Sequence, residues 1–420
     1  MGVITMKKLL IRGGVPLCGE TEIAGFKNAA LPILYATVLC GEVSVIENLP
    51  RIRDVLLTLE ILKAMGAVVL FIEPHTVMID TRHALPCRSP DGMVSGLRAS
   101  SYLLGAELGR FGKTRAAIPG GCRIGARPLD LHVLAFTALG ADITCADGAI
   151  SATAPEGLCG GEIAFPTPSV GATVNAILAS VMAPGKTRIT GAAKEPHIVD
   201  LCTYLTACGA KIDGAGSGEL LVHGGKRLSG ARHRLMPDMI EAGTFLTAVG
   251  AAGGEILLRG ADERHLASTV TALCDMGMQI GSTGEGLLAR RRGGLSPCRL
   301  IAEPYPGIPT DMHPQIAAMA TVADGESRIA DHVFPGRFGY AAELCRMGAQ
   351  VSVSEGEITV LPSALRGAHV SAVDLRAGAA EVVAALAAHG RTVITESEVL
   401  ERGYEDLGRK LTELGATVEG

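Results

Sequence analysis

The stretch Ala64-Met65-Gly66-Ala67-Val68 organises this chain, because the same signature returns five more times at intervals of about seventy residues. The other copies are Ala138-Leu139-Gly140-Ala141-Asp142, Ala207-Cys208-Gly209-Ala210-Lys211, Asp275-Met276-Gly277-Met278-Gln279, Arg346-Met347-Gly348-Ala349-Gln350 and Glu413-Leu414-Gly415-Ala416-Thr417. Each copy follows a helical pattern, such as residues 55–62, and precedes a β-rich stretch. A glycine in this place is typical of a helix C-cap that leads into a strand. The sequence therefore predicts six structural repeats.

A second helical pattern precedes each signature. Examples lie at residues 31–36, 174–179 and 380–385, and they lead into strand patterns at 44–46, 187–190 and 392–395. The predicted unit is thus helix, strand, helix and strands. Six such units divide most economically into two similar α/β domains of three units each, split near residues 234–238, with a ligand cleft between them. A solenoid is the alternative, but the long units and large aliphatic cores disfavour it.

Composition limits the classes of protein that need considering. With 420 residues, 48% of them hydrophobic, the chain is long enough for two domains with full cores. Only 3% of the residues are aromatic and 54 are glycine, so thin aliphatic layers with closely approaching backbones are expected. The eleven cysteines form no CxxC pair and no Cys/His cluster, which predicts reduced thiols, no zinc site and a cytoplasmic protein. A net charge of -5 and the short apolar runs argue against nucleic-acid binding and membrane insertion.

One glycine-rich segment carries the clearest chemical signal. It is Pro119-Gly120-Gly121-Cys122-Arg123-Ile124-Gly125-Ala126-Arg127-Pro128. The glycines favour a loop that moves and closes over a ligand, and the arginines favour a thiolate and suit a phosphate or carboxylate. This pattern predicts a reactive Cys122 beside an anion site. The structural alternative is a turn in which Cys122 is a small buried filler, which the flanking charges disfavour.

Seven segments in a fixed order extend this signal over the whole chain. They are Ala24-Gly25-Phe26-Lys27-Asn28-Ala29-Ala30, Leu97-Arg98-Ala99-Ser100, the Cys122 loop continuing into Leu129-Asp130-Leu131-His132, Pro168-Ser169-Val170-Gly171-Ala172-Thr173, Pro309-Thr310-Asp311-Met312, Asp374-Leu375-Arg376-Ala377 and Glu401-Arg402-Gly403-Tyr404-Glu405. From Leu10 to the C-terminus the chain thereby resembles the UDP-N-acetylglucosamine 1-carboxyvinyltransferase family of the EPSP synthase superfamily.

The resemblance implies an α/β enolpyruvyl transferase fold. Two inside-out α/β domains, each of three pseudo-repeats, are expected, and the first strand of the chain completes the second domain. The implied bounds are 27–234 for the first domain, which carries the Cys122 lid loop, and 1–26 plus 235–420 for the second. The active site is expected in the interdomain cleft.

The resemblance also implies a reaction. The chain would transfer the enolpyruvyl group of phosphoenolpyruvate to the 3-hydroxyl of UDP-N-acetylglucosamine and release phosphate, the first committed step of peptidoglycan synthesis. Cys122 is then the acid that protonates the methylene carbon, holds a pyruvyl phosphate adduct and reacts with fosfomycin. Asp311 is the base near the 3-hydroxyl or the binder of the sugar, and the two roles are compatible.

The same resemblance implies the residues that bind the two substrates. Those for phosphoenolpyruvate are Lys27, Asn28, Arg127 and Arg402, of which Lys27 and Arg402 also count as catalytic because they stabilise developing charge. Those for UDP-N-acetylglucosamine are Asn28, Arg98, Arg127, Pro128, Leu129, Asp130, Leu131, Ser169, Val170, Gly171, Asp311 and Val333. Ser169 to Gly171 begin a predicted helix, whose N-terminal amides suit a diphosphate. No cofactor and no metal is implied, and a monomer is expected.

Several residues have structural alternatives. Asp374 and Arg376 can cap a helix and bridge elements, His132 can orient a loop, and Arg337 can form a domain-closure salt bridge. The run Gly214-Ala215-Gly216-Ser217-Gly218 imitates a nucleotide loop but lacks the third spaced glycine, so a hairpin turn is predicted.

The chain departs from the family pattern at a few positions. Met239 stands where arginine is usual, His197 where glutamate is usual, His313 where glutamine is common, and Phe338-Gly339-Tyr340 where Phe-Met-His is common. These departures are also compatible with an alternative, a divergent paralogue that uses a different acceptor sugar.

Two rival functions also stay open. An EPSP synthase has the same fold but uses no lid cysteine, and a non-catalytic UDP-sugar sensor would keep the pocket without turnover. The joint presence of Lys27, Cys122, Asp311 and Arg402 argues against the sensor, because a binding protein has no need of the thiol.

Overall fold

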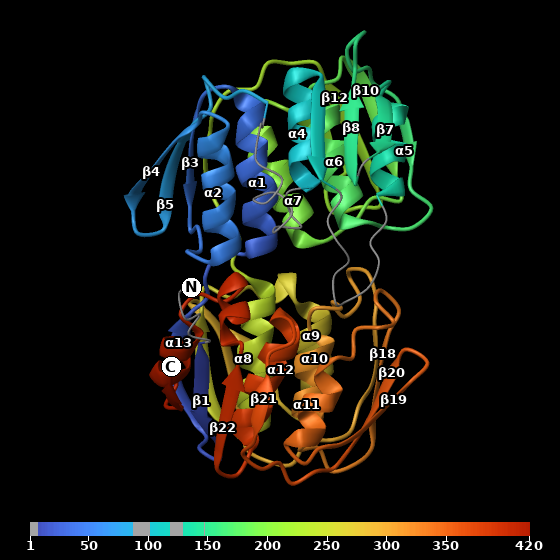
Figure 1. Cartoon of the computed structure of the whole chain (residues 1–420). Coiled ribbons are helices and arrows are strands. Elements are labelled where there is room, and N and C mark those ends of the chain that lie inside the picture. Colours follow the sequence, from blue (N-terminus) through green and yellow to red (C-terminus); the bar gives the residue numbers. More distant parts are fainter. Residues whose placement is uncertain (1–6, 87–100, 118–128, 147) are drawn as a thin grey trace, which may run out of the picture. The chain divides into compact units, whose positions relative to one another are not determined.

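The computed structural model describes residues 7–86, 101–117, 129–146 and 148–420 (Figure 1). The chain divides into two compact units. Unit 1 contains the described residues up to Ala24 and from Pro237 to Gly420, and unit 2 contains those from Gly25 to Met236. Both units are built from helices and small mixed sheets, as the α/β prediction requires.

Unit 2 holds three copies of one repeat, in the order helix, strand, helix and hairpin. The first copy is α1 (Lys27–Cys40), β3 (Val43–Glu47), α2 (Arg53–Ala64), β4 (Val68–Glu73) and β5 (Thr76–Asp80). The second is α4 (Tyr102–Phe111), β6 (Lys113–Ala117), α5 (Asp130–Ala138), β7 (Asp142–Ala146) and β8 (Ala149–Thr153). The third is α6 (Val170–Ser180), β10 (Gly185–Thr190), α7 (Pro196–Ala207), β11 (Lys211–Asp213) and β12 (Glu219–Gly224).

Unit 1 holds the other three copies. The fourth is α8 (Met239–Ala252), β14 (Gly254–Arg259), the short η2 (Glu263–His265), α9 (Ala267–Asp275), β15 (Gln279–Ser282) and β16 (Gly286–Arg291). The fifth is α10 (His313–Ala320), β18 (Ser327–Asp331), α11 (Tyr340–Arg346), β19 (Gln350–Ser354) and β20 (Glu357–Leu361). The sixth is α12 (Leu375–Ala387), β22 (Arg391–Thr395), η3 (Ser397–Arg402), α13 (Leu407–Glu413) and β23 (Thr417–Glu419).

Six further strands complete the sheets. They are β1 (Lys8–Arg12), β2 (Leu17–Glu22), β9 (Glu162–Ala164), β13 (Arg232–Arg234), β17 (Arg299–Ala302) and β21 (His369–Ser371). Five of them pair in parallel with the first strand of a repeat: β2 with β14, β9 with β10, β13 with β3, β17 with β18 and β21 with β22. The sixth repeat lacks a second hairpin strand of its own, and β1 fills that place between β22 and β23. The implied role of the first strand is thereby confirmed.

The glycine of every signature ends a helix, as predicted. The φ angles are 95° at Gly66, 88° at Gly140, 101° at Gly209, 105° at Gly277, 90° at Gly348 and 84° at Gly415. The following residue donates its amide back into the last helical turn each time, as from Ala67 to the Leu62 carbonyl and from Ala416 to the Leu411 carbonyl. This is the Schellman closure, which needs a residue without a β-carbon because L side chains rarely adopt such φ angles.

Helices form the interior of each unit, and the sheets lie around them (Figure 1). All of α1 from Ala29 to Cys40 and all of α8 from Met239 to Ala251 are buried. Glycines allow the close approach that the aromatic-poor composition predicted: a β-carbon at Gly250 would lie only 2.2 Å from the Met319 sulfur. The inside-out arrangement follows from this burial of whole helices.

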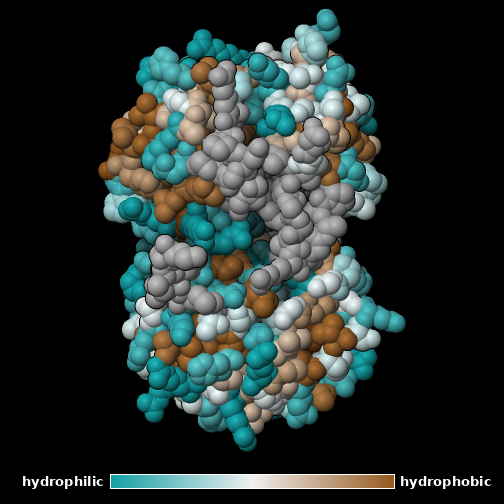
Figure 2. Space-filling model, viewed as in Figure 1, coloured by the Kyte–Doolittle hydropathy of each residue, from teal (hydrophilic) through white to brown (hydrophobic). Residues whose placement is uncertain are grey.

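Strand β4 forms an edge of its sheet in unit 2 and is unusually apolar on its surface. The sheet order is β13-β3-β5-β4, and Val68, Leu70, Phe71 and Ile72 are all exposed. In Figure 2 apolar surface gathers over this strand. An exposed edge of this kind leaves backbone N–H and C=O groups without a neighbouring strand.

Two sequence features that could be mistaken for binding motifs have ordinary structural roles. Strands β11 and β12 pair antiparallel across the glycine run 214–218, so the predicted hairpin is confirmed. The basic residues Arg290, Arg291 and Arg292 lie at the end of β16 and directly after it, and Arg291 Nη1 donates to the carbonyl of Gly250 at 2.7 Å. Among the helices of the described ranges, none combines the length and the apolar run that crossing a bilayer requires.

The core of unit 1 contains a carboxyl group that is neutral at pH 7. Glu381 in α12 is fully buried, and neither carboxyl oxygen has a hydrogen-bond partner among the described residues. Burial raises the pKa of Glu381 to about 9 from an ordinary 4.5, with the carboxylates of Glu343 and Asp374 adding to the shift. Because the pKa is higher in the folded state, this contribution to stability is complete below the unfolded pKa and is lost as the pH rises toward 9.

We therefore expect Glu381→Gln to flatten the pH dependence of stability. Between about pH 5 and about pH 8 the wild-type free energy of unfolding should fall by on the order of 3 kcal/mol from this group, a fall that the variant lacks. Urea unfolding at both pH values measures the difference. Glu156→Gln, at an exposed loop position, is the matched control. Parallel pH profiles for the wild type and Glu381→Gln would refute the buried neutral acid.

Candidate active site

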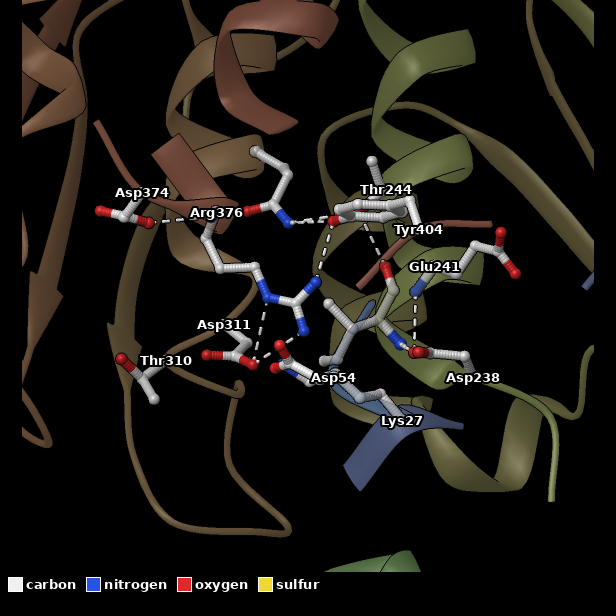
Figure 3. Close-up of polar contacts among 12 residues, drawn as sticks. Lys27, Asp54, Asp238, Glu241, Thr244, Thr310, Asp311, Asp374, Arg376 and Tyr404 are labelled. Atoms are coloured by element: carbon white, nitrogen blue, oxygen red, sulfur yellow. Dashed lines mark hydrogen bonds and ion pairs between the residues drawn. The ribbon is translucent and has the colours of Figure 1, made fainter. Parts of the chain in front are cut away.

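In unit 1 the carboxylate of Asp311 is held between two arginines just before α10. Figure 3 shows one of them, Arg376. Arg337 Nη1 donates to Asp311 Oδ1 at 2.7 Å. Arg376 donates to Oδ2 from Nε at 3.2 Å and from Nη2 at 3.0 Å. Both arginines are almost fully buried, whereas a quarter of the Asp311 side chain is exposed. The result is a rigid, ionised carboxylate that still faces the outside of its unit.

Arg376 is itself fixed from its other side by Tyr404. Arg376 Nη1 donates to the Tyr404 hydroxyl at 3.0 Å, and the guanidinium lies 5.5 Å from the centre of the phenol ring. The same hydroxyl lies 2.9 Å from Thr244 Oγ1, on α8 (Figure 3). Burial raises the pKa of Tyr404, although Arg376 partly opposes the shift, so the phenol keeps its proton. Arg376 therefore has one orientation available, with its fork toward Asp311.

The N-terminus of α12 places Arg376 in this position. Asp374 Oδ1 accepts the backbone amides of Arg376 at 2.8 Å and Ala377 at 3.0 Å, which is the geometry of an N-cap. Both structural alternatives raised for this segment are thus observed: Asp374 caps the helix, and Arg376 bridges elements. The capped start of α12 therefore places Arg376 within hydrogen-bonding distance of Asp311.

Arg337 has its described partners within one unit. It donates to Asp311 and, from the same Nη1, to Thr310 Oγ1 at 3.2 Å. All three residues belong to unit 1. Within unit 1, the observed role of Arg337 is therefore to hold the Asp311 segment.

Asp331, which the sequence analysis did not single out, joins two of the predicted sugar-binding positions. Its Oδ1 accepts the amides of Val333 at 2.8 Å and Phe334 at 2.9 Å, and its Oδ2 accepts the Thr310 hydroxyl at 2.6 Å. Thr310 directly precedes Asp311. An aspartate at the end of a strand, two residues before a turn, was the available signal.

The predicted phosphoenolpyruvate residues are only partly described. In unit 2 Lys27 and Asn28 form the first turn of α1, and Lys27 Nζ lies 3.4 Å from Asp54 Oδ2 in a mostly buried pair (Figure 3). In unit 1 Arg402 is the last residue of η3 and is half-buried. Cys122 and Arg127, together with Arg98 and Pro128 of the predicted nucleotide site, lie outside the described residues.

Two predicted nucleotide-binding segments start neighbouring helices of unit 2. Leu129, Asp130 and Leu131 lie at the start of α5, and Ser169, Val170 and Gly171 at the start of α6. Ser169 is the N-cap, as its hydroxyl accepts the Ala172 amide at 3.4 Å. The predicted helix start at residues 169–171 is confirmed.

A buried asparagine ties these two helix starts together. Asn175 Nδ2 lies 2.9 Å from His132 Nδ1 and donates to the Gly171 carbonyl at 3.3 Å, while its Oδ1 accepts the Gly105 amide at 2.7 Å. Burial lowers the pKa of His132 to about 4, although Asp130 opposes the shift, so the ring is neutral and its Nδ1 accepts from the amide. His132 therefore connects α5 to α6 through Asn175. Asn175 was missed, and its place inside an apolar helical pattern was the only signal.

The departures from the family pattern occupy structural positions. Met239 is buried at the start of α8, directly after the N-cap Asp238, and the His197 ring packs edge-on against Phe26 at 5.3 Å. His313 and Tyr340 contact each other, with Nδ1 and the hydroxyl 3.1 Å apart. Within the described ranges no group of His, Cys, Asp and Glu has the geometry of a metal site.

Comparison with known proteins decides the family. A family model described as EPSP synthase (3-phosphoshikimate 1-carboxyvinyltransferase) matches residues 11–411. The chain belongs to this family. The UDP-N-acetylglucosamine 1-carboxyvinyltransferase of Nitratidesulfovibrio vulgaris is 44% identical over 98% of this chain and 99% of that protein. The UDP-N-acetylglucosamine 1-carboxyvinyltransferase 1 of Staphylococcus aureus is 42% identical over 99% of each chain.

Solved structures of EPSP synthase family members agree with this fold. The enolpyruvyl transferase NikO from Streptomyces tendae has a TM-score of 0.88 at 28% identity, covering 98% of both chains. An EPSP synthase from Acinetobacter baumannii has a TM-score of 0.73 at 18% identity, covering 98% of this chain and 99% of that one, which shows the fold alone. The predicted family, the enolpyruvyl transferase fold and the transferase class are confirmed.

Proposed function

We propose that this protein transfers the enolpyruvyl group of phosphoenolpyruvate to the 3-hydroxyl of UDP-N-acetylglucosamine and releases phosphate, the first committed step of peptidoglycan synthesis. The observation that carries the proposal is Asp311, a carboxylate held on both oxygens by Arg337 and Arg376. It occurs in a chain whose 42–44% identical relatives are named for this activity. We also propose that the enzyme is monomeric and works in the cytoplasm.

The surroundings of Asp311 favour one of its two expected roles. Two guanidinium groups already stabilise the negative charge, which makes the carboxylate a weaker base. A quarter of the Asp311 side chain is exposed, so a substrate can still reach it. We therefore assign Asp311 mainly to binding and orienting the acceptor hydroxyl. As the bond to phosphoenolpyruvate forms, the hydroxyl proton becomes much more acidic, and the Asp311 carboxylate then accepts it.

The remaining chemistry requires an acid and several cations. We assign the protonation of the methylene carbon of phosphoenolpyruvate to Cys122, whose thiolate can also hold the pyruvyl phosphate adduct. Lys27, Arg127 and Arg402 supply the positive charge that the phosphate and carboxylate of this substrate need, and Asn28 follows Lys27 in the first turn of α1. Loss of phosphate and return of one methyl proton to the Cys122 thiolate then give the enolpyruvyl product.

The nucleotide part of the acceptor needs hydrogen-bond donors for its diphosphate and a complementary surface for its uridine. We assign the diphosphate to the N-terminal amides of α6 at residues 169–171 and the uridine to residues 127–131, with Arg98 near the phosphates. Val333 contacts the sugar. The bonds of Asn175 to His132 and to the Gly171 carbonyl support a fixed geometry of the two helix starts.

Phosphate release from phosphoenolpyruvate tests the function. The purified protein is assayed with UDP-N-acetylglucosamine, with 3-phosphoshikimate and without acceptor. Release that depends on the UDP-sugar is the expected result. Release with 3-phosphoshikimate alone would make the protein an EPSP synthase, and UDP-sugar binding without release would make it a sensor.

A further inference from the structure

Asp331 is the point at which two segments of unit 1 meet. It ends β18 with only 1% of its side chain exposed. Through Oδ1 it holds the amides of Val333 and Phe334, and through Oδ2 it holds the hydroxyl of Thr310, the neighbour of Asp311. One carboxylate therefore fixes the spacing between the Val333 turn and the Asp311 segment.

A histidine and a tyrosine lie behind this carboxylate. His313 is fully buried at the start of α10, with Nε2 3.2 Å from Asp331 Oδ2 and Nδ1 3.1 Å from the Tyr340 hydroxyl. Burial lowers the pKa of His313 even though Asp331 opposes the shift, and burial raises the pKa of Tyr340. A neutral ring and a protonated phenol have one consistent arrangement: the phenol donates to Nδ1, which leaves the ring proton on Nε2, 3.2 Å from Asp331 Oδ2.

The charged groups around the His313 ring favour a neutral His313 beside an ionised Asp331. Asp331 stays ionised because the donors His313 and Thr310 outweigh the burial that opposes ionisation, and its pKa falls to about 2. The positive charge of Arg337, which binds Thr310 and Asp311, lowers the pKa of His313 further, although the Asp311 carboxylate opposes this shift. Polar contacts therefore run without a gap from Tyr340 to His313, from His313 to Asp331 and from Asp331 to Thr310.

We propose that Asp331, His313 and Tyr340 are positioning residues that set the affinity of the enzyme for its nucleotide-sugar acceptor. The inference rests on the proposed function, in which Asp311 and Val333 contact the sugar. The polar contacts lead to these two positions and hold them at a fixed spacing. The cations assigned to phosphoenolpyruvate lie on other segments, with Lys27 in α1 and Arg402 in η3. Affinity for the acceptor should therefore change without a matching change for phosphoenolpyruvate.

Steady-state phosphate release with each substrate varied in turn tests this selectivity. Tyr340→Phe removes the bond that orients His313, and we expect KM for UDP-N-acetylglucosamine to rise about fivefold while KM for phosphoenolpyruvate and kcat stay within about twofold. His313→Leu should raise the acceptor KM about tenfold or more. His313→Gln, which keeps an N–H donor for Asp331, should recover most of that loss.

The double variant separates positioning from general damage. Because Tyr340 acts through His313, the variant His313→Leu/Tyr340→Phe should be no worse than His313→Leu alone. Tyr305→Phe, which removes a surface hydroxyl bonded to the Arg264 carbonyl, is the matched control and should change nothing. Equal rises in both KM values, or additive effects in the double variant, would overturn the proposal.

A second readout does not depend on the substrate. In the free protein, hydrogen exchange at the amides of Val333 and Phe334 should be several-fold faster in Tyr340→Phe than in the wild type, because Asp331 is less firmly held. Unchanged exchange rates would overturn the positioning role even if the enzyme used another acceptor. A wild type that releases no phosphate with the UDP-sugar would instead refute the proposed function, while the exchange rates would still decide the inference.

Discussion

Replacing Arg376 with glutamine is expected to lower kcat/KM for phosphate release by on the order of a thousandfold, because Asp311 loses both bonds to one of its oxygens. Glutamine keeps the polarity but removes the positive charge that stabilises the carboxylate. The hydroxyl of Tyr404 also loses its guanidinium donor. Asp311 would then be free to rotate or to take up a proton, and either change removes the fixed acceptor for the sugar hydroxyl.

Two further variants make this result specific. Arg376→Lys keeps the charge but cannot reach Asp311 and Tyr404 together, so we expect an intermediate loss. Arg328→Gln removes an arginine from the surface of the same unit and should be near neutral. Turnover assays are paired with thermal unfolding, since Arg376 is buried. Near-normal kcat/KM in a folded Arg376→Gln would contradict the assignment of Asp311.

Replacing Lys410 with methionine is expected to lower the free energy of unfolding by about 3 to 5 kcal/mol. Lys410 Nζ lies 2.7 Å from Glu241 Oε1, and both side chains are buried. The other Glu241 oxygen accepts the Ala24 amide at 2.7 Å. Without Lys410 the glutamate is left as a buried charge with one backbone donor, which is among the most destabilising single changes.

The pH dependence of this loss has a definite sign. Burial already raises the pKa of Glu241, with Lys410 as the main opposing influence, so removing the lysine raises it further. A raised folded-state pKa gives stability that is present at low pH and lost as the pH rises, so the defect should be larger at about pH 8 than at about pH 5.

Urea unfolding of three variants measures the effect. Lys410→Met combined with Glu241→Gln should recover much of the loss, since no buried charge remains. Lys63→Met breaks an exposed pair with Glu60 and should cost less than about 1 kcal/mol. A Lys410→Met protein as stable as Lys63→Met would show that the buried pair contributes little.

The fold was predictable because its rule is local and repeated. A helix that ends in a glycine with positive φ needs only a few neighbouring residues, and Gly66 and its five counterparts all obey it. Composition predicted the close helix packing, because a chain with few aromatic residues and many glycines lets its backbones approach closely. Pairings between distant segments, such as β2 with β14 and β13 with β3, were not predictable, because strand register depends on partners far away in the sequence.

The candidate site was predictable in its members but not in its contacts. The resemblance supplied Asp311 and Lys27, yet nothing in the sequence indicated that Arg376 and Arg337 would share one carboxylate. Asn175 sits inside an apolar helical pattern, where a polar residue has no periodic signature of its own. Contacts that depend on side-chain direction across separate helices need the packed structure.

The place of β1 has a consequence for synthesis on the ribosome. Leu10 pairs with Val393 on one side and with Glu419 on the other, so both partners of β1 are synthesised long after it. At typical translation speeds this strand waits roughly 20 to 80 s with both edges open, while all of unit 2 has already emerged. We therefore expect the nascent chain to complete unit 2 first and to leave both edges of β1 unpaired until β22 and β23 have emerged.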